Sequence, residues 1–328
     1  MNRTPRNTAG FGTLAVAFAA LACATATSAG AQDYPNRRIT FIVGFAAGGF
    51  ADSVARIIGE HVSKTLGQTV LVDNRGGAAS NIAARAVAIA PPDGYTVLVS
   101  TTSLAINATL YKKLDYSLLD DLVPVAIAVR APETFSASAS KPQTLQKFIE
   151  AARSGQLTFS SAGVGSGSHL TWFSFFQNNA KATVVHVPFR GGEPAMQAAM
   201  GGQVDGFAST ASASVVGQLT EGTLTCLAVA SAQRYALLPN CPSLAELGYP
   251  GAEGSSWVGF WVPKGTPANV IVALNKAINA ITDNPKATEN LKRNGELPGL
   301  SVEAAEKFVV GEVATWGERV KASGAQVD

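Results

Sequence analysis

The stretch ITFIVGFAAGGFAD, residues 39–52, joins an apolar β-forming run to a pair of glycines and the start of an amphipathic pattern. It predicts a buried strand over 39–45, a turn at Gly48 and Gly49, and a helix over 49–66. Glycines in such a turn let the backbone approach a ligand closely. The free N–H groups at the start of the helix suit a carboxylate or phosphate. The alternative is a turn that needs flexibility and binds nothing.

The same strand, turn and helix order recurs along the chain, which is typical of α/β proteins. Further strands are expected over 69–73, 95–100, 123–130, 157–161, 184–189, 204–207, 224–231 and 259–262. Further helices are expected over 81–90, 144–153, 170–178, 268–282, 285–294 and 302–322.

The pattern changes at Ala131-Pro132, where a connection is expected to leave the first sheet, and the chain returns near 250–260. Two α/β domains follow from this layout. Residues 32–134 and 256–328 form a discontinuous first domain, and residues 135–255 form the second. Ligands in such a layout bind in the cleft between domains at the strand ends, and closure is a hinge motion.

A second loop, residues 161–169, follows the strand over 157–161 and reads SAGVGSGSH. Its glycines are spaced G-x-G-x-G and no acid lies about 20 residues on, so it is not a dinucleotide fingerprint. Val164 stands where a hydrolase nucleophile elbow has glycine. The loop's backbone N–H groups and hydroxyls suit a small anion or a carboxylate. His169 is either a further donor or an ordinary histidine at a helix start.

Composition excludes several other classes. The net charge of +2 gives no basic field for nucleic acid. The histidines and cysteines show no metal-ligand spacing, so neither a metal nor a cofactor is expected. After removal of the N-terminal segment, Cys226 and Cys241 remain. In an oxidising compartment they form a disulfide or stay as separate buried thiols, and the sequence leaves both open.

The N-terminal segment carries the pattern of a secretory signal. Arg3 and Arg6 precede an apolar run over 11–22, and residues 28–31 read SAGA. This predicts a signal peptide over 1–31, cleaved near Ala31, and export of the mature chain. A lipoprotein anchor at Cys23 is the alternative, but Leu21 lies one position away from its usual place in a lipobox.

Several segments in this order resemble the Bug-type (TctC-like) extracytoplasmic solute receptors of tripartite tricarboxylate transporters, over nearly all of the mature chain. They include YPNRRITFIVGFAAGGFADSVARII, TFSSAGVGSGSHL and VVHVPFRGGEPAMQAAMGGQVDGF. The resemblance implies a two-domain periplasmic binding protein of the Venus flytrap kind, type II-like, without catalytic activity. It also implies a monomer, a small carboxylate ligand and the two membrane subunits of such a transporter as partners.

The resemblance also implies a binding mode, in which backbone groups and ordered waters hold the carboxylate between two glycine-containing loops. On one side it assigns Phe45, Ala46, Ala47, Gly48, Gly49, Phe50 and Asp52. On the other it assigns Ser161, Gly163, Ser166, Ser168, His169, Arg190 and Gly191, with Thr101, Thr102 and Asp205 completing the site. An arginine such as Arg190 can clamp a carboxylate with two bonds, although an exposed loop arginine is the alternative.

The sequence departs from the family pattern in its aromatic residues. Phe50 replaces the small residue usual after the two glycines, and Trp172, Phe173, Phe175 and Phe176 crowd one helix. Citrate-like acids, dicarboxylates, amino acids and aromatic acids such as terephthalate all occur as family ligands, and aromatic residues would suit the last group. Core packing is the alternative explanation for the four helical aromatics.

Other functions compete with transport. An exported sensory receptor would have the same cleft. A secreted serine hydrolase would use Ser166 or Ser168 with His169, but the spacing suggests no third member of a triad.

Overall fold

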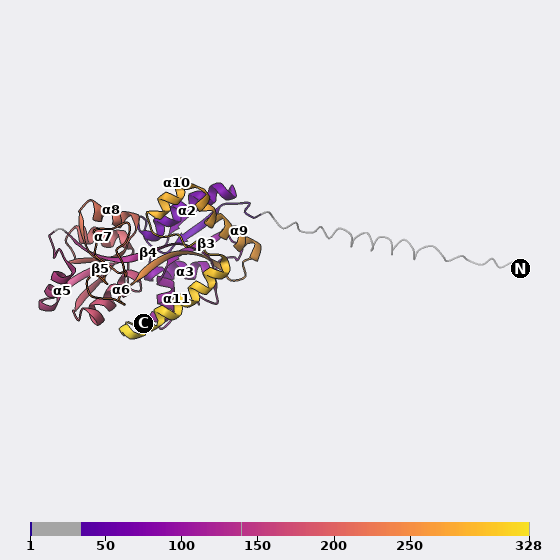
Figure 1. The fold of residues 1–328 in the computed structure, drawn as a ribbon. Coiled ribbons are helices and arrows are strands. Elements are labelled where there is room, and N and C mark those ends of the chain that lie inside the picture. Colours follow the sequence, from indigo (N-terminus) through magenta and orange to yellow (C-terminus); the bar gives the residue numbers. More distant parts are fainter. Residues whose placement is uncertain (2–33, 139, 328) are drawn as a thin grey trace. The chain divides into compact units, whose positions relative to one another are not determined.

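The computed structural model describes residue 1 and residues 34–138 and 140–327. The predicted signal peptide, apart from Met1, lies outside the described residues, as do its cleavage site and Cys23. The chain divides into Met1–Asn36 and a compact unit, Arg37–Asp328. All of the elements below belong to the second unit (Figure 1).

The described strands join in a nine-stranded sheet in the order β2-β1-β3-β9-β4-β7-β5-β6, with β8 also paired to β4. Strands β1, β2 and β3 run parallel, as do β5, β6 and β7, whereas β9 is antiparallel to β3 and β4. The bounds are β1 (Ile39–Val43), β2 (Val70–Asn74), β3 (Thr96–Thr101), β4 (Leu122–Ser138), β5 (Leu157–Ser161), β6 (Val184–Pro188), β7 (Gly206–Thr210), β8 (Leu224–Val229) and β9 (Ser255–Pro263). We call the part built on β1–β3 lobe 1 and the part built on β5–β8 lobe 2.

Strand β4 connects the two lobes. Its first part pairs with β9 as far as Pro132, and its second part pairs with β7 and β8 from Glu133 onward. The chain thus leaves its pairing with lobe 1 after Pro132, near the point expected from the sequence, but the strand expected to end at residue 130 continues to Ser138. Proline lacks a backbone N–H, but the carbonyl of Pro132 still accepts a bond from the N–H of Ala211 at 3.0 Å. The domain limits proposed from the sequence, with a break after residue 134, stay a prediction.

Helices cover both lobes. Their bounds are α2 (Phe50–Leu66), α3 (Asn81–Ala88), α4 (Ser103–Leu110), α5 (Leu145–Ser154), α6 (Gly167–Ser174), α7 (Gly192–Met200), α8 (Ala213–Thr220), α9 (Ala268–Asn279), α10 (Pro285–Lys292) and α11 (Val302–Ser323), with short turns η1 (Ala78–Ser80), η2 (Phe175–Asn179) and η3 (Ala280–Asp283). Within the described residues, no helix combines the length and apolar composition that a membrane span requires.

Helix α6 starts earlier than the sequence pattern predicts. The expected helix covers 170–178, but α6 begins at Gly167 and continues into η2. Ser166 caps it, because the Ser166 hydroxyl accepts a bond from the His169 N–H at 3.1 Å. A serine cap satisfies one of the free N–H groups of the first turn. The glycine-serine loop is therefore part loop and part helix.

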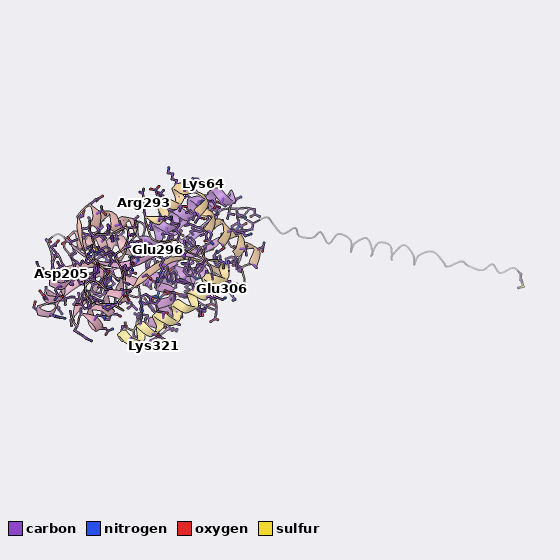
Figure 2. All side chains as sticks on the ribbon, in the orientation of Figure 1. Lys64, Asp205, Arg293, Glu296, Glu306 and Lys321 are labelled. Atoms are coloured by element: carbon purple, nitrogen blue, oxygen red, sulfur yellow. A yellow bond between two sulfur atoms is a disulfide. The ribbon has the colours of Figure 1, made fainter. Side chains whose placement is uncertain are left out.

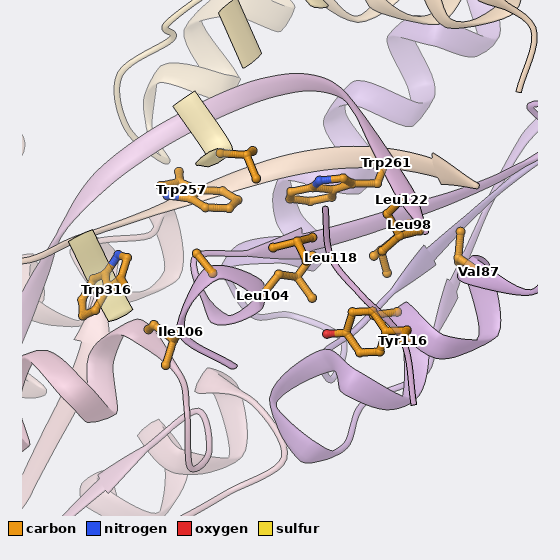
Figure 3. Close-up of a cluster of buried hydrophobic side chains, with 14 of the residues drawn as sticks. Val87, Leu98, Leu104, Ile106, Tyr116, Leu118, Leu122, Trp257, Trp261 and Trp316 are labelled. Atoms are coloured by element: carbon orange, nitrogen blue, oxygen red, sulfur yellow. The ribbon is translucent and has the colours of Figure 1, made fainter. Parts of the chain in front are cut away.

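The core of lobe 1 is a cluster around Trp257 and Trp261 of β9 (Figure 3). The C-terminal helix α11 adds Val309, Trp316 and Val320, which are all buried there. The helical spacing of this apolar stripe predicted a core-facing surface, and the contacts confirm it. The last helix of the chain therefore returns to lobe 1.

The core of lobe 2 is aromatic. Phe135 of β4 lies with ring centroids 4.9 Å from Phe148 and 5.0 Å from both Trp172 and Phe176. Trp172, Phe175 and Phe176 are buried in this cluster. Core packing therefore accounts for three of the four helical aromatics, and those three are not ligand-stacking groups.

Lobe 2 also contains a disulfide. Cys226 of β8 and Cys241 in the loop after it are bonded, with their Cα atoms 5.6 Å apart. The bond ties this loop to the sheet.

Candidate functional site

A cavity of about 50 Å³ lies where the carboxyl ends of strands from both lobes meet. That volume corresponds to a few water molecules. Its wall comprises Phe45, Gly49, Phe50, Ala51, Thr101, Ala162, Ser166, Gly167, Ser168, Gly192, Glu193, Met196, Ala208, Ser209, Thr210, Ser212, Ser214, Val215 and Ser256.

Helices α2, α6, α7 and α8 all begin at this wall. Their first or capping residues, Gly49, Ser166, Gly192 and Ser212, line the cavity. The N-terminus of a helix carries partial positive charge and unpaired N–H groups. Converging helix starts therefore make the cavity favourable for an anion.

Side chains supply hydroxyls instead of positive charge. Thr101, Ser166, Ser168, Ser209, Thr210, Ser212, Ser214 and Ser256 line the cavity. Among the described residues no lysine or arginine does so, and the ionisable group in the wall is Glu193. Within the same range, no group of three His, Cys, Asp or Glu side chains is placed to hold a metal ion.

Several residues expected from the sequence lie in this wall. Phe45 is buried with 6 % of its surface exposed, and the Phe50 ring is half-buried beside it. The other predicted site residues that line this cavity are Gly49, Thr101, Ser166 and Ser168.

A second cavity, of about 390 Å³, lies on the other side of Phe45 and Ala162, which line both. Gly163 and Arg190 line this second cavity. The carbonyl of Arg190 accepts a bond from the N–H of Ala46 at 3.2 Å, so the loops of the two lobes touch here.

Asp52 does not line either cavity. Its buried carboxylate accepts bonds from the Gly48 N–H at 2.9 Å, Arg56 Nε at 2.8 Å and Asn74 Nδ2 at 2.9 Å. Burial raises the pKa of Asp52, but the bonds from Arg56, Gly48 and Asn74 outweigh it and the net pKa is lowered. The carboxylate thus fixes the turn before α2, while Ala47 and Gly48 are exposed.

Thr102 and Asp205 also lie outside both cavities. The Thr102 hydroxyl accepts a bond from the Trp257 N–H at 3.1 Å. Asp205 pairs with Lys141 Nζ at 2.7 Å and accepts bonds from the N–H and hydroxyl of Thr158, both at 2.9 Å. Figure 2 labels Asp205 among the side chains of lobe 2. These contacts give both residues a structural role. Gly191 adopts a φ of 147°, and a side chain there would meet Ala46.

His169, the last residue of the loop over 161–169, lies against His186 of β6. The rings of His169 and His186 are stacked with centroids 4.0 Å apart, and Ser161 Oγ lies 2.7 Å from His186 Nε2. Burial, with the nearby His186, lowers the pKa of His169 to about 3, and burial lowers that of His186 to about 4. Both rings are neutral at neutral pH. Ser161 is fully buried, and neither Ser161 nor the two histidines line either cavity.

The hydrolase alternative finds no support at Ser166 or Ser168. The Ser166 hydroxyl donates to the Gly163 carbonyl at 2.8 Å and lies 3.1 Å from Ser168 Oγ. The Nδ1 atom of His169 accepts a bond from the Gly165 N–H at 3.3 Å. The histidine thus holds the loop instead of activating either serine.

Sequence reasoning missed the hydroxyl-bearing wall residues at the end of β7, directly after it and on β9. They belong to the hydroxyl-rich run 209–214, STASAS, and to Ser256 of β9. The run directly follows a predicted strand, and hydroxyls at the carboxyl end of a strand are a recognisable signal.

We predict that Ser166→Ala costs about 1 kcal/mol of folding free energy, because it removes the cap of α6. It should also weaken anion binding in the cavity, because the wall loop loses the bond from the Ser166 hydroxyl to the Gly163 carbonyl. Ser301→Ala is the matched control, since Ser301 caps α11 through the Ala304 N–H at 3.2 Å, away from the cavity. Chemical denaturation and calorimetric titration measure both effects. Equal binding by the two variants would exclude Ser166 from the site.

Solved structures place the fold among the periplasmic binding proteins. The structure of periplasmic binding protein BugD is 33% identical with a TM-score of 0.84, over 89% of this chain and 99% of that one. Rpa4515 of R. palustris with adipate is 30% identical with a TM-score of 0.85, over 90% and 100%. MatC (Rpa3494) from Rhodopseudomonas palustris with bound malate is 31% identical with a TM-score of 0.82, over 88% and 100%.

The family itself follows from the sequence match. Residues 54–325 match the tripartite tricarboxylate transporter family receptor, TctC. The chain belongs to this family of solute-binding receptors. The resemblance stated from the sequence is thereby confirmed, as is the mixed α/β, two-domain periplasmic binding protein fold.

Proposed function

We propose that this protein is a periplasmic receptor that captures a small carboxylate in the cavity between its lobes. The observation that carries the proposal is the convergence of the starts of α2, α6, α7 and α8 on one hydroxyl-lined cavity. Backbone N–H groups and hydroxyls then bind the carboxylate without a cationic side chain. Two relatives of similar fold, Rpa4515 and MatC, hold adipate and malate.

The receptor delivers its ligand to the two membrane subunits of a tripartite tricarboxylate-type transporter. Membership of the TctC family supports this step. The chain is exported by the signal peptide over 1–31 and acts as a monomeric binding protein. The proposed site comprises the wall residues of the cavity together with the β1–α2 turn that Asp52 holds.

A thermal-shift screen of the mature protein against malate, adipate, citrate, glutamate and terephthalate tests the proposal. A ligand present at a hundredfold excess over its Kd stabilises the folded state by about 2.7 kcal/mol. A shift with one group of acids, followed by a calorimetric Kd, identifies the substrate class. No shift with any of these acids would overturn the proposal.

Glu193→Gln is expected to strengthen dicarboxylate binding several-fold, because it removes a like charge from the cavity wall. Glu193 accepts a bond from Gln197 Nε2 at 2.9 Å, four residues along α7. Glu150→Gln is the matched control. Glu150 accepts a bond from Gln146 Nε2 at 3.1 Å, also four residues apart on a helix, but it lies on α5 outside the cavity. Calorimetric titration with adipate compares the variants. Weaker binding by Glu193→Gln would instead show that the carboxylate accepts a hydrogen bond from the ligand.

A further inference from the structure

A buried carboxyl group lies directly behind the cavity wall. Glu133 of β4 is fully buried, and its two carboxyl oxygens lie 3.3 and 3.2 Å from the Thr210 hydroxyl. A Cβ atom added at Gly167 would lie 2.7 Å from Glu133 Oε1 and 3.4 Å from Ser256 Oγ. Thr210, Gly167 and Ser256 all belong to the wall. A single layer of wall atoms therefore separates the Glu133 carboxyl from the cavity.

No positive charge balances this group in the described part of the chain. None of the ion pairs found there includes Glu133. Both backbone groups of Glu133 are hydrogen-bonded. Its N–H donates to the Gly254 carbonyl at 2.9 Å, and its carbonyl accepts from the Ala230 N–H at 2.7 Å. An ionised carboxylate without a cation is costly inside a protein.

The surrounding elements bring no compensating charge. Strands β7 and β9 carry no titratable side chain, and Cys226 of β8 is bonded in the disulfide. On α6, burial keeps His169 neutral at neutral pH by lowering its pKa to about 3. Arg130 on β4 is exposed and donates to Ser255 Oγ. Glu193 in the cavity wall and Glu253, which precedes Gly254, are acidic and bring no positive charge. Burial, opposed by the bond from Thr210, raises the pKa of Glu133 to about 8.

We propose that Glu133 is a specificity-determining residue of the cavity, held as a neutral carboxylic acid so that the site accepts an anion. The inference rests on the proposed function of the cavity as a carboxylate site. An ionised Glu133 would present its charge at the start of α6, where the ligand's carboxylate is bound. The bound anion and the proton on Glu133 therefore stabilise each other, and this coupling is reciprocal.

The experiment measures adipate binding by calorimetry between pH 6.5 and 9.5 for the wild type and for Glu133→Gln. Both carboxyls of adipate are ionised throughout this range, since ordinary carboxyl pKa values lie near 4.3. The wild-type Kd should rise by up to tenfold per pH unit above about pH 8. The Glu133→Gln variant, whose amide stays neutral, should show a constant Kd, and Glu150→Gln should behave as the wild type does.

Infrared spectra of the unliganded protein, with and without isotope-labelled glutamate, give a second measurement. A protonated carboxyl band at pH 7 that is absent from Glu133→Gln supports the inference. A wild-type Kd that is constant across the range, or an equal slope in Glu133→Gln, overturns it. The wild-type titration and spectra need no variant and decide the matter if Glu133→Gln fails to fold. Binding of no acid by either protein overturns the proposed function and the coupling together, whereas pH-independent binding overturns the coupling alone.

Discussion

Replacing Ser214 by tyrosine is expected to weaken adipate binding at least a hundredfold while the protein stays folded. Ser214 lies in the first turn of α8 and lines the cavity, and its hydroxyl is 3.2 Å from Ser212 Oγ. Because Ser214 belongs to the cavity wall, a phenol ring at this position takes up space that the ligand needs. Ser214 is half-buried, so the larger side chain does not overpack the core. A hundredfold loss corresponds to about 2.7 kcal/mol of binding free energy.

Calorimetric titration with adipate measures this loss, and thermal unfolding checks the fold. Gln146→Tyr is the control, because it places the same side chain in the first turn of α5, on an exposed surface away from the cavity. It should bind as the wild type does. Unchanged affinity in Ser214→Tyr would show that the ligand binds elsewhere, and the larger cavity behind Phe45 would be the first place to look.

Replacing Phe135 by alanine is expected to lower the free energy of unfolding by about 3–5 kcal/mol, the usual loss for a buried aromatic ring. The ring is fully buried and contacts Phe148, Phe159, Trp172 and Phe176 at centroid distances of 4.9 to 6.2 Å. Its removal takes one ring contact from each of these four side chains and leaves a cavity between them. Urea denaturation, followed by tryptophan fluorescence, measures the change.

Phe173→Ala provides the comparison for this prediction. Phe173 is half-buried on α6, and its ring contact is with His169 at 5.4 Å. Its loss should cost less than half as much as that of Phe135. Equal costs for the two variants would contradict the view that Phe135 is the centre of the lobe 2 core.

Much of the fold could be predicted because local signals agree with the tertiary contacts. The strand over 157–161 and the helix start at Pro285 have the predicted bounds. The prediction failed at β4, where Pro132 suggested an end to the strand. The strand continues past Pro132 because it pairs with β9 up to this residue and with β7 after it. Such long-range pairing leaves no mark in the local sequence.

The site could be predicted only in part. The turn before α2 and the serine loop were found because glycines and a helix start are local signals. The roles of Asp52 and Asp205 could not be read from the sequence, since each carboxylate is used by partners distant in the chain, such as Asn74 and Lys141. Glu133 was missed for the same reason, because its burial results from the packing of β4, β7 and α6.

The absence of cationic side chains from the described cavity wall has a consequence for how such receptors diversify. The proposed anchoring by main-chain groups would survive every substitution that preserves the backbone, so mutation would not easily remove it. Side chains such as Phe50, Met196 and Val215 are then free to change the size and polarity of the cavity. A single scaffold can therefore evolve affinity for new acids in small steps, while the backbone contacts to the carboxylate stay the same.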